Sequence, residues 1–245
     1  MKTICLFFTA IMVFSLCVVG QTKEDVIEKV WEGAGGEKTW KDSRFLTFVF
    51  TPEKDGKTSI RRSHLWDRYT GDYRFESNTA DNQKLIVLFN IKNHKGTSYL
   101  NGKALSDSAN VKQIEKAYSY FIDDSYWLLA PLKLEDEGVS VSLEDTEVIE
   151  GINYEVLHLT FGNVGITPGD QYWLYVNSES GQIKRWKFLL KGKKDPGIFD
   201  CVNYKDLGGG LKLSTRKEDI NQDNSINFPV ASVLISVERQ KFTKR

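Results

Sequence analysis

The sequence is poor in cysteine and histidine, with three of each in 245 residues. Two of the cysteines lie in an apolar N-terminal stretch, which leaves Cys201 alone in the rest of the chain. No intramolecular disulfide framework is therefore expected. Cys201 lies in the strand-like segment FDCVNY, where a single cysteine is typically a buried small apolar residue rather than a nucleophile.

An excess of charge of either sign is also missing, because 33 basic residues balance 33 acidic ones. The basic residues Lys191, Lys193 and Lys194 and the basic C-terminal tail are too short to follow a phosphate backbone. The glycine run 208–210 lacks the Lys-Ser/Thr that follows a phosphate-binding loop. The composition therefore predicts neither a nucleic-acid partner nor an electrostatic attraction to membranes.

Catalytic motifs are absent as well. The sequence contains no HExxH or HxH spacing and no GxSxG elbow, and its clustered carboxylates at 134–138 and 143–145 read as solvated turns. His64, His94 and His158 are scattered, and only the fold could bring them together as a zinc site. We expect a protein that is not an enzyme and has no cofactor, with a metal-dependent hydrolase as the least favoured alternative.

One loop resembles a calcium-binding loop in its alternation of oxygen-bearing side chains: Asp219, Asn221, Asp223, Ser225 and Asn227. Asn224 stands where an EF-hand needs glycine, and Val230 stands where it needs a bidentate glutamate. The pattern favours an ordinary Asn/Asp-rich loop over a weak calcium site.

Residues 1–20 have the features of a signal peptide. A basic start is followed by the nearly unbroken apolar run 4–19, and the small residues Val18 and Gly20 predict cleavage before Gln21. Two alternatives are a lipoprotein modified at Cys17, which lacks a small residue before it, and a short membrane anchor. We expect export to the periplasm or the extracellular space, with residues 21–245 as a single domain.

The rest of the chain has the pattern of an α+β protein. A helix is predicted over 22–36, with Thr22 and Asp25 as a capping box, and a second over 107–122. Between and after them, about eleven antiparallel strands are predicted, as a meander that the second helix interrupts once. The clearest hairpin joins 172–176 to 183–190, and its first strand is apolar on both faces. We expect a curved antiparallel half-barrel that is covered by helices.

Aromatic residues are spread over these strands and helices. In a curved sheet one face meets either a packed core or a cavity that holds an apolar ligand. If a cavity is present, the residues predicted to line or border it are Trp66, Tyr73, Phe75, Trp127, Trp173 and Trp186.

Several segments together resemble a known arrangement. They are the first helix ending in GAGG, HLWDRYTGDYRFE at 64–76, SYWLLAPLKLEDEGV at 125–139 and PGDQYW at 168–173. This order is similar to an uncharacterised secreted family related to the periplasmic lipoprotein carriers with the LolA/LolB-like fold.

The resemblance implies an unclosed barrel with helices as a lid over an apolar concavity. It also implies a lipid, a lipoprotein acyl chain or another hydrophobic small molecule as the ligand, no cofactor and no catalytic residue, and a place peripheral to the cell envelope. A structural or protein-interaction domain of the cell envelope, with a filled core, remains the alternative.

Overall fold

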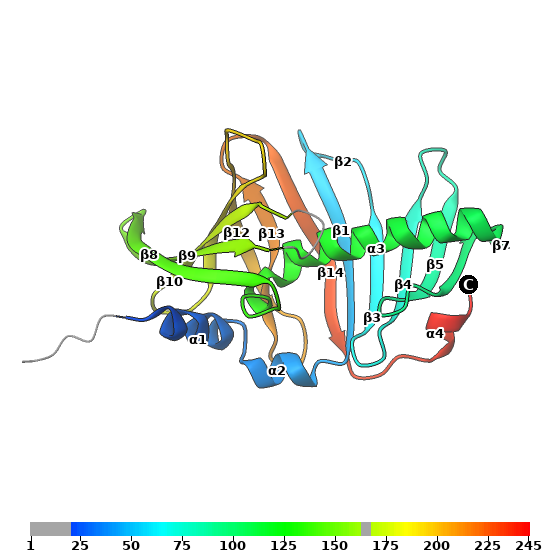
Figure 1. Ribbon diagram of the computed structural model, residues 1–245, viewed down its shortest axis with the longest axis horizontal. Helices are drawn as coiled ribbons and strands as arrows, with labels where there is room; N and C mark the ends of the chain where they lie inside the picture. Colours follow the sequence, from blue (N-terminus) through cyan, green and yellow to red (C-terminus); the bar gives the residue numbers. More distant parts are fainter. Residues whose placement is uncertain (1–20, 163–167) are drawn as a thin grey trace, which may run out of the picture.

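The computed structural model describes residues 21–162 and 168–245, so the predicted signal peptide lies outside the described residues. One long helix crosses a fourteen-stranded antiparallel sheet that does not close (Figure 1). The predicted α+β half-barrel is confirmed, with more strands than the eleven expected. Two of the additional strands, β2 and β7, contain only two residues each.

The sheet consists of two meanders. The first contains β1 (Phe45–Lys54), β2 (Lys57–Thr58), β3 (Arg62–Asp67), β4 (Asp72–Asn78), β5 (Lys84–Asn90), β6 (Gly96–Leu100) and β7 (Lys103–Ala104). The second contains β8 (Val139–Ile149), β9 (Ile152–Phe161), β10 (Gln171–Asn177), β11 (Ile183–Leu189), β12 (Gly197–Asp206), β13 (Lys212–Asp219) and β14 (Asn224–Leu234). The first strand, β1, pairs with the last, β14, so the two meanders form one sheet whose outermost strands are β7 and β8.

One strand is longer than its sequence pattern indicates. The segments 139–143 and 145–149 each have the length of a separate strand, but both belong to β8, which pairs with β9. The pairing shifts register between Glu144 and Glu147, and such a bulge breaks the apolar/polar alternation from which strands are recognised.

Three short helices lie outside the sheet. The helix α1 (Lys23–Gly33) begins at the predicted capping box, in which Thr22 and Asp25 each accept a hydrogen bond from the other's backbone N–H. The other two are α2 (Glu37–Asp42) and α4 (Gln240–Thr243). Within the described residues, no helix combines the length and apolar character that crossing a membrane requires.

The helix α3 (Asp107–Leu129) joins the meanders and runs across the concave face of the sheet (Figure 1). It is seven residues longer than the predicted helix 107–122 because the apolar segment after Ile122 continues it. It passes into the 3₁₀ turn Ala130–Leu132, where Pro131 has no N–H to extend the α-helical hydrogen bonds. Its buried side chains, including Ile114, Phe121 and Leu128, pack on the sheet.

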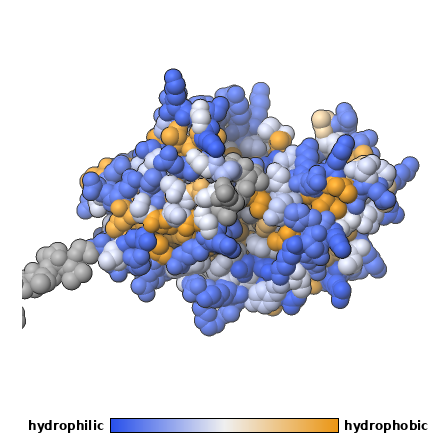
Figure 2. All heavy atoms as spheres, in the orientation of Figure 1, coloured by the Kyte–Doolittle hydropathy of each residue, from blue (hydrophilic) through white to orange (hydrophobic). Residues whose placement is uncertain are grey.

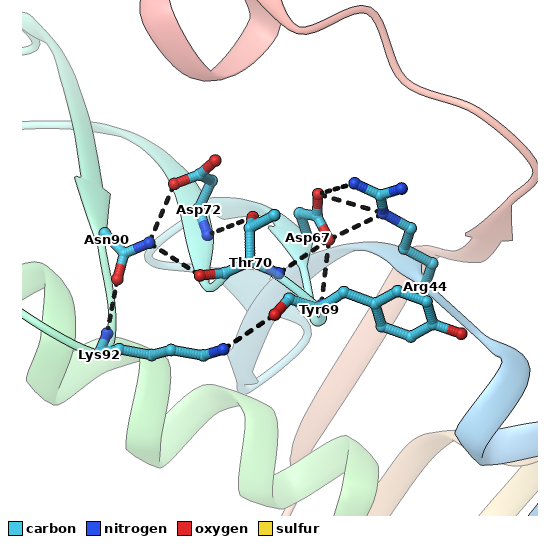
Figure 3. A network of polar contacts seen from close by, with 7 residues as sticks. All are labelled: Arg44, Asp67, Tyr69, Thr70, Asp72, Asn90 and Lys92. Atoms are coloured by element: carbon cyan, nitrogen blue, oxygen red, sulfur yellow. Dashed lines mark hydrogen bonds and ion pairs between the residues drawn. The ribbon is translucent and has the colours of Figure 1, made fainter.

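A polar network holds the turn between β3 and β4 (Figure 3). The Asp67 carboxylate accepts from the Arg44 guanidinium at 2.8 Å and from the backbone N–H groups of Tyr69 and Thr70. The Asn90 side-chain amide, at the end of β5, donates to the Thr70 carbonyl. Burial alone would raise the pKa of Asp67, but these hydrogen bonds outweigh it and lower the pKa. The network fixes three neighbouring strand ends relative to one another.

Candidate functional site

Five of the six predicted ligand-binding aromatics lie in the interior between α3 and the concave face of the sheet. Tyr73 and Phe75 on β4 and Trp186 on β11 are buried, while Trp66 on β3 and Trp127 on α3 are partly buried. The Trp127 and Trp186 rings lie 4.5 Å apart, centroid to centroid. The helix and the sheet therefore share an aromatic interior.

Trp173 is the exception. Its neighbours Tyr172 and Leu174 point into the core, so the alternation along β10 turns Trp173 to the convex face. There its ring stacks on His158 at 4.7 Å, and the Lys187 ammonium lies 4.5 Å from its centroid. Trp173 does not border the concave interior.

The concave interior is tightly packed. The void beside Trp127, Leu128 and Trp186 has a volume of about 10 Å³, which is the space of about one water molecule. In this conformation the apolar side chains of α3 fill the space in which an acyl chain would lie.

A buried polar network joins the middle of α3 to strands β3 and β4. The Asp124 carboxylate accepts two hydrogen bonds from the Arg62 guanidinium, at 2.5 and 2.6 Å. His64 Nε2 lies 3.0 Å from the same carboxylate, and His64 Nδ1 lies 2.8 Å from the Tyr73 hydroxyl. Asp124, His64 and Tyr73 are almost completely excluded from solvent. The network was not foreseen, because its partners are about sixty residues apart in the chain.

Burial lowers the pKa of His64 and raises that of Tyr73 well above its usual value. A neutral His64 that donates from Nε2 to Asp124 and accepts the Tyr73 O–H satisfies all three groups. Because Arg62 and His64 belong to β3 and Asp124 belongs to α3, the network ties the helix to the sheet.

The three histidines lie in three different places. His64 belongs to the buried network, His94 packs its ring on Tyr118, and His158 stacks on Trp173. Across 21–162 and 168–245, no group of three or more His, Cys, Asp or Glu side chains is arranged to hold a metal ion. The segment with the calcium-loop pattern is not one loop: Asp219 ends β13, residues 220–223 form the turn, and Ser225 and Asn227 belong to β14.

Lys217 on β13 is a second buried ionisable group. Its side chain is inside the core opposite Cys201, which is buried as expected, and its ammonium donates to the Ser214 carbonyl at 2.7 Å. Burial lowers the pKa of Lys217 to about 8. No carboxylate of the described residues forms an ion pair with it.

A cavity of about 850 Å³ that is open to solvent lies between α3 and the ends of β3, β4 and β5. Its lining combines apolar side chains with a basic rim. The apolar part includes Ile60, Phe75, Leu85 and Tyr120. The basic residues of the rim are Arg61, Lys84 and Lys116, while Arg62, also in the lining, is already paired with Asp124. The carboxylate of Glu76, also in the lining, already pairs with Arg74 and Lys84. An amphiphile with an apolar chain and an anionic head matches this lining.

The fold is shared with solved structures. A LolA-superfamily protein from Nitrosomonas europaea is 16% identical, with a TM-score of 0.54 over 92% of this chain and 99% of that one. A domain named for outer-membrane lipoprotein sorting, from Vibrio parahaemolyticus, is 11% identical, with a TM-score of 0.51 over 90% and 97%.

A DUF1329 family protein from Desulfovibrio piger is also 11% identical, with a TM-score of 0.50 over 89% of this chain and 96% of that one. No family model matches the sequence, and no curated protein matches it either. The predicted resemblance to the LolA-like fold is confirmed at the level of the fold.

Proposed function

We propose that the chain is a non-enzymatic lipid-binding protein that takes an acyl chain or a similar hydrophobic group between α3 and the sheet. The 850 Å³ cavity supports this proposal most directly, because it is an open, half-apolar entrance at the edge of an aromatic interior. The LolA-like fold of the neighbours agrees with it. The proposal also agrees with the predicted export to the periplasm or the extracellular space.

Binding requires α3 to move away from the sheet, because the interior void is far smaller than an acyl chain. Apolar surface that closes on the lipid contributes about 25 cal/mol per Å². The same movement separates the Arg62–Asp124 pair, unless α3 pivots about that pair and opens at the cavity end. The lipid head then stays beside the basic rim.

The packed interior favours a second candidate, a protein-interaction domain with a permanently filled core. The two candidates differ in a simple property. A lipid-binding protein takes up added lipid, whereas a filled core does not.

The test uses two isoleucines that are each 43% exposed, Ile60 in the cavity and Ile220 beyond the end of β13. Residues 21–245 are titrated with a fluorescent fatty acid. Ile60→Glu is expected to weaken binding about tenfold or more, because the carboxylate must be desolvated against the chain. Ile220→Glu is expected to bind like the unmodified protein.

Native mass spectrometry and organic extraction of the protein from its own compartment complete the test. A co-purifying lipid supports the proposal. A bare mass together with no fatty-acid uptake, or equal weakening by both substitutions, contradicts it and favours the interaction domain.

A further inference from the structure

The charge of the molecule is unevenly distributed, although its sum is zero. Residues 134–183 contain no lysine or arginine, and this range includes β8, β9 and β10, the last three strands at one end of the sheet. The acidic residues of β8 and its flanks are solvent-exposed: Glu135, Asp136, Glu137, Glu144, Asp145, Glu147 and Glu150. This edge is therefore an acidic surface.

A groove of about 500 Å³ lies at this edge, between α1 and the chain from Leu134 to β8. Its floor is apolar and includes Ile27, Trp31, Val139 and Val141. Figure 2 shows hydrophobic side chains gathered along this edge, above α1. Apolar surface in a charged surrounding marks an interaction site.

The rim of the groove is acidic and includes Glu24, Glu28, Glu32, Glu37 and Glu135. Lys23 pairs with Glu24 and Lys41 pairs with Glu37, while the Trp31 indole N–H donates to Glu135 at 2.9 Å. Among the described residues, no basic side chain pairs with Glu28 or Glu32. These two lie one turn apart on α1, on the side of the groove.

The outer edge of β8 offers backbone hydrogen bonds beside the groove. The Gly162 N–H donates to the Gly138 carbonyl, so the alternation of an antiparallel ladder directs the backbone groups of Val141 and Leu143 outward. The sheet ends at β8, and no described strand pairs with this edge. Such an edge accepts an added strand.

We propose that this groove and the β8 edge dock an extended segment of a partner protein whose groove-facing side chains include both apolar and basic residues. The segment pairs with β8 as an additional strand, so every second side chain points into the groove. Among these, apolar side chains cover Trp31 and Val141, and Lys or Arg residues two positions along meet Glu28 and Glu32. The acidic rim disfavours an anionic lipid surface or a nucleic acid as the occupant. The proposal is independent of lipid binding, because the 850 Å³ cavity and the groove share no residue.

The probe is a ten-residue peptide with serine at the odd positions and valine and lysine in turn at the even positions, titrated by calorimetry into residues 21–245. Its valine–glutamate counterpart is the control. The lysine peptide is expected to bind at least tenfold more tightly than the glutamate peptide. The variant Glu28→Lys/Glu32→Lys is expected to reverse this preference. The variant Asp81→Lys/Glu115→Lys makes the same charge change at exposed positions elsewhere and is expected to leave the preference intact.

Val141→Pro tests the strand addition, because it removes an outward N–H without breaking a hydrogen bond to β9. The substitution is expected to weaken binding of the lysine peptide at least tenfold, while the circular dichroism spectrum of the protein stays unchanged. If Val141→Pro unfolds the chain, amide hydrogen exchange of the unmodified protein tests the strand addition instead. The lysine peptide, but not the glutamate peptide, is then expected to slow exchange at the Val141 and Leu143 amides. Equal binding of both peptides, or no protection of these amides, overturns the proposal. The proposal is also overturned if the protein dimerises with increasing concentration and Glu28→Lys/Glu32→Lys abolishes the dimer, because the groove then binds a second copy of the chain.

Discussion

At the scale of single residues, buried ionisable groups show where the interior departs from a simple apolar core. Lys217 carries an ammonium group among Trp127, Trp186 and Cys201, and its only described hydrogen-bond acceptor is a backbone carbonyl. A charged group in such a site costs free energy, and this is why burial lowers its pKa.

Replacing Lys217 with methionine is expected to stabilise the protein at pH 7 by up to about 3 kcal/mol, because no charge then has to be buried. The sign follows from the pKa. The folded value of about 8 lies below the ordinary 10.5, so between these two values the unfolded chain binds more protons. The stability of the unmodified protein therefore rises with pH in that range, and the gain from methionine shrinks.

Urea unfolding of both proteins at pH 7 and pH 9.5 measures this difference. A methionine variant that is less stable than the unmodified protein at pH 7 would contradict the account. It would mean that the hydrogen bond to Ser214 outweighs the cost of burying the charge.

At the scale of elements, the buried face of α3 combines apolar contacts with the Arg62–Asp124 ion pair. Removing one partner of a buried pair leaves the other charge without compensation. Asp124→Ala is therefore expected to lower the free energy of unfolding by roughly 3–5 kcal/mol, because the Arg62 guanidinium stays inside without its carboxylate.

The adjacent Asp123 supplies the control, since it is exposed and forms no ion pair. Asp123→Ala is expected to change the free energy of unfolding by no more than about 0.5 kcal/mol. Chemical denaturation of both variants measures the effect. Similar losses in the two would indicate that helix content, rather than the buried pair, is responsible.

The contact between α1 and the β10–β11 turn is a second prediction at this scale. A side chain at Gly33 would place its Cβ 2.6 Å from the Gly181 carbonyl carbon, which is backbone and cannot turn aside. Alanine normally stabilises a helix relative to glycine by about 1 kcal/mol. Here Gly33→Ala is expected to destabilise the protein, because α1 must separate from the turn.

Glu28→Ala in the exposed part of the same helix is the matched comparison, and it is expected to have little effect or to stabilise slightly. Thermal unfolding of both variants measures the contrast. A higher melting temperature for Gly33→Ala would contradict this, and would show that the β10–β11 turn moves to accommodate the added methyl group.

At the scale of the whole molecule, the sequence was sufficient for the fold class, the meander order of the strands and the capping box of α1, since these follow from local periodicity and turn residues. It was insufficient for the face of Trp173, because residues 172–176 are apolar on both sides and alternation cannot assign the core side. It also missed the network of Arg62, His64 and Asp124, whose members meet only when α3 lies on β3. Local patterns carry no information about such contacts.

The pairing of β1 with β14 has a consequence for how the chain is made. The strand that leaves the ribosome first occupies the middle of the sheet, and its partner is the strand that leaves last. Until residues 224–234 are available, one edge of the first meander has no partner at Phe48 and Val49, and its apolar concave face lacks the packing of the second meander. The complete sheet can therefore form only after residues 224–234 have been synthesised, and until then an incomplete chain remains a candidate for chaperones.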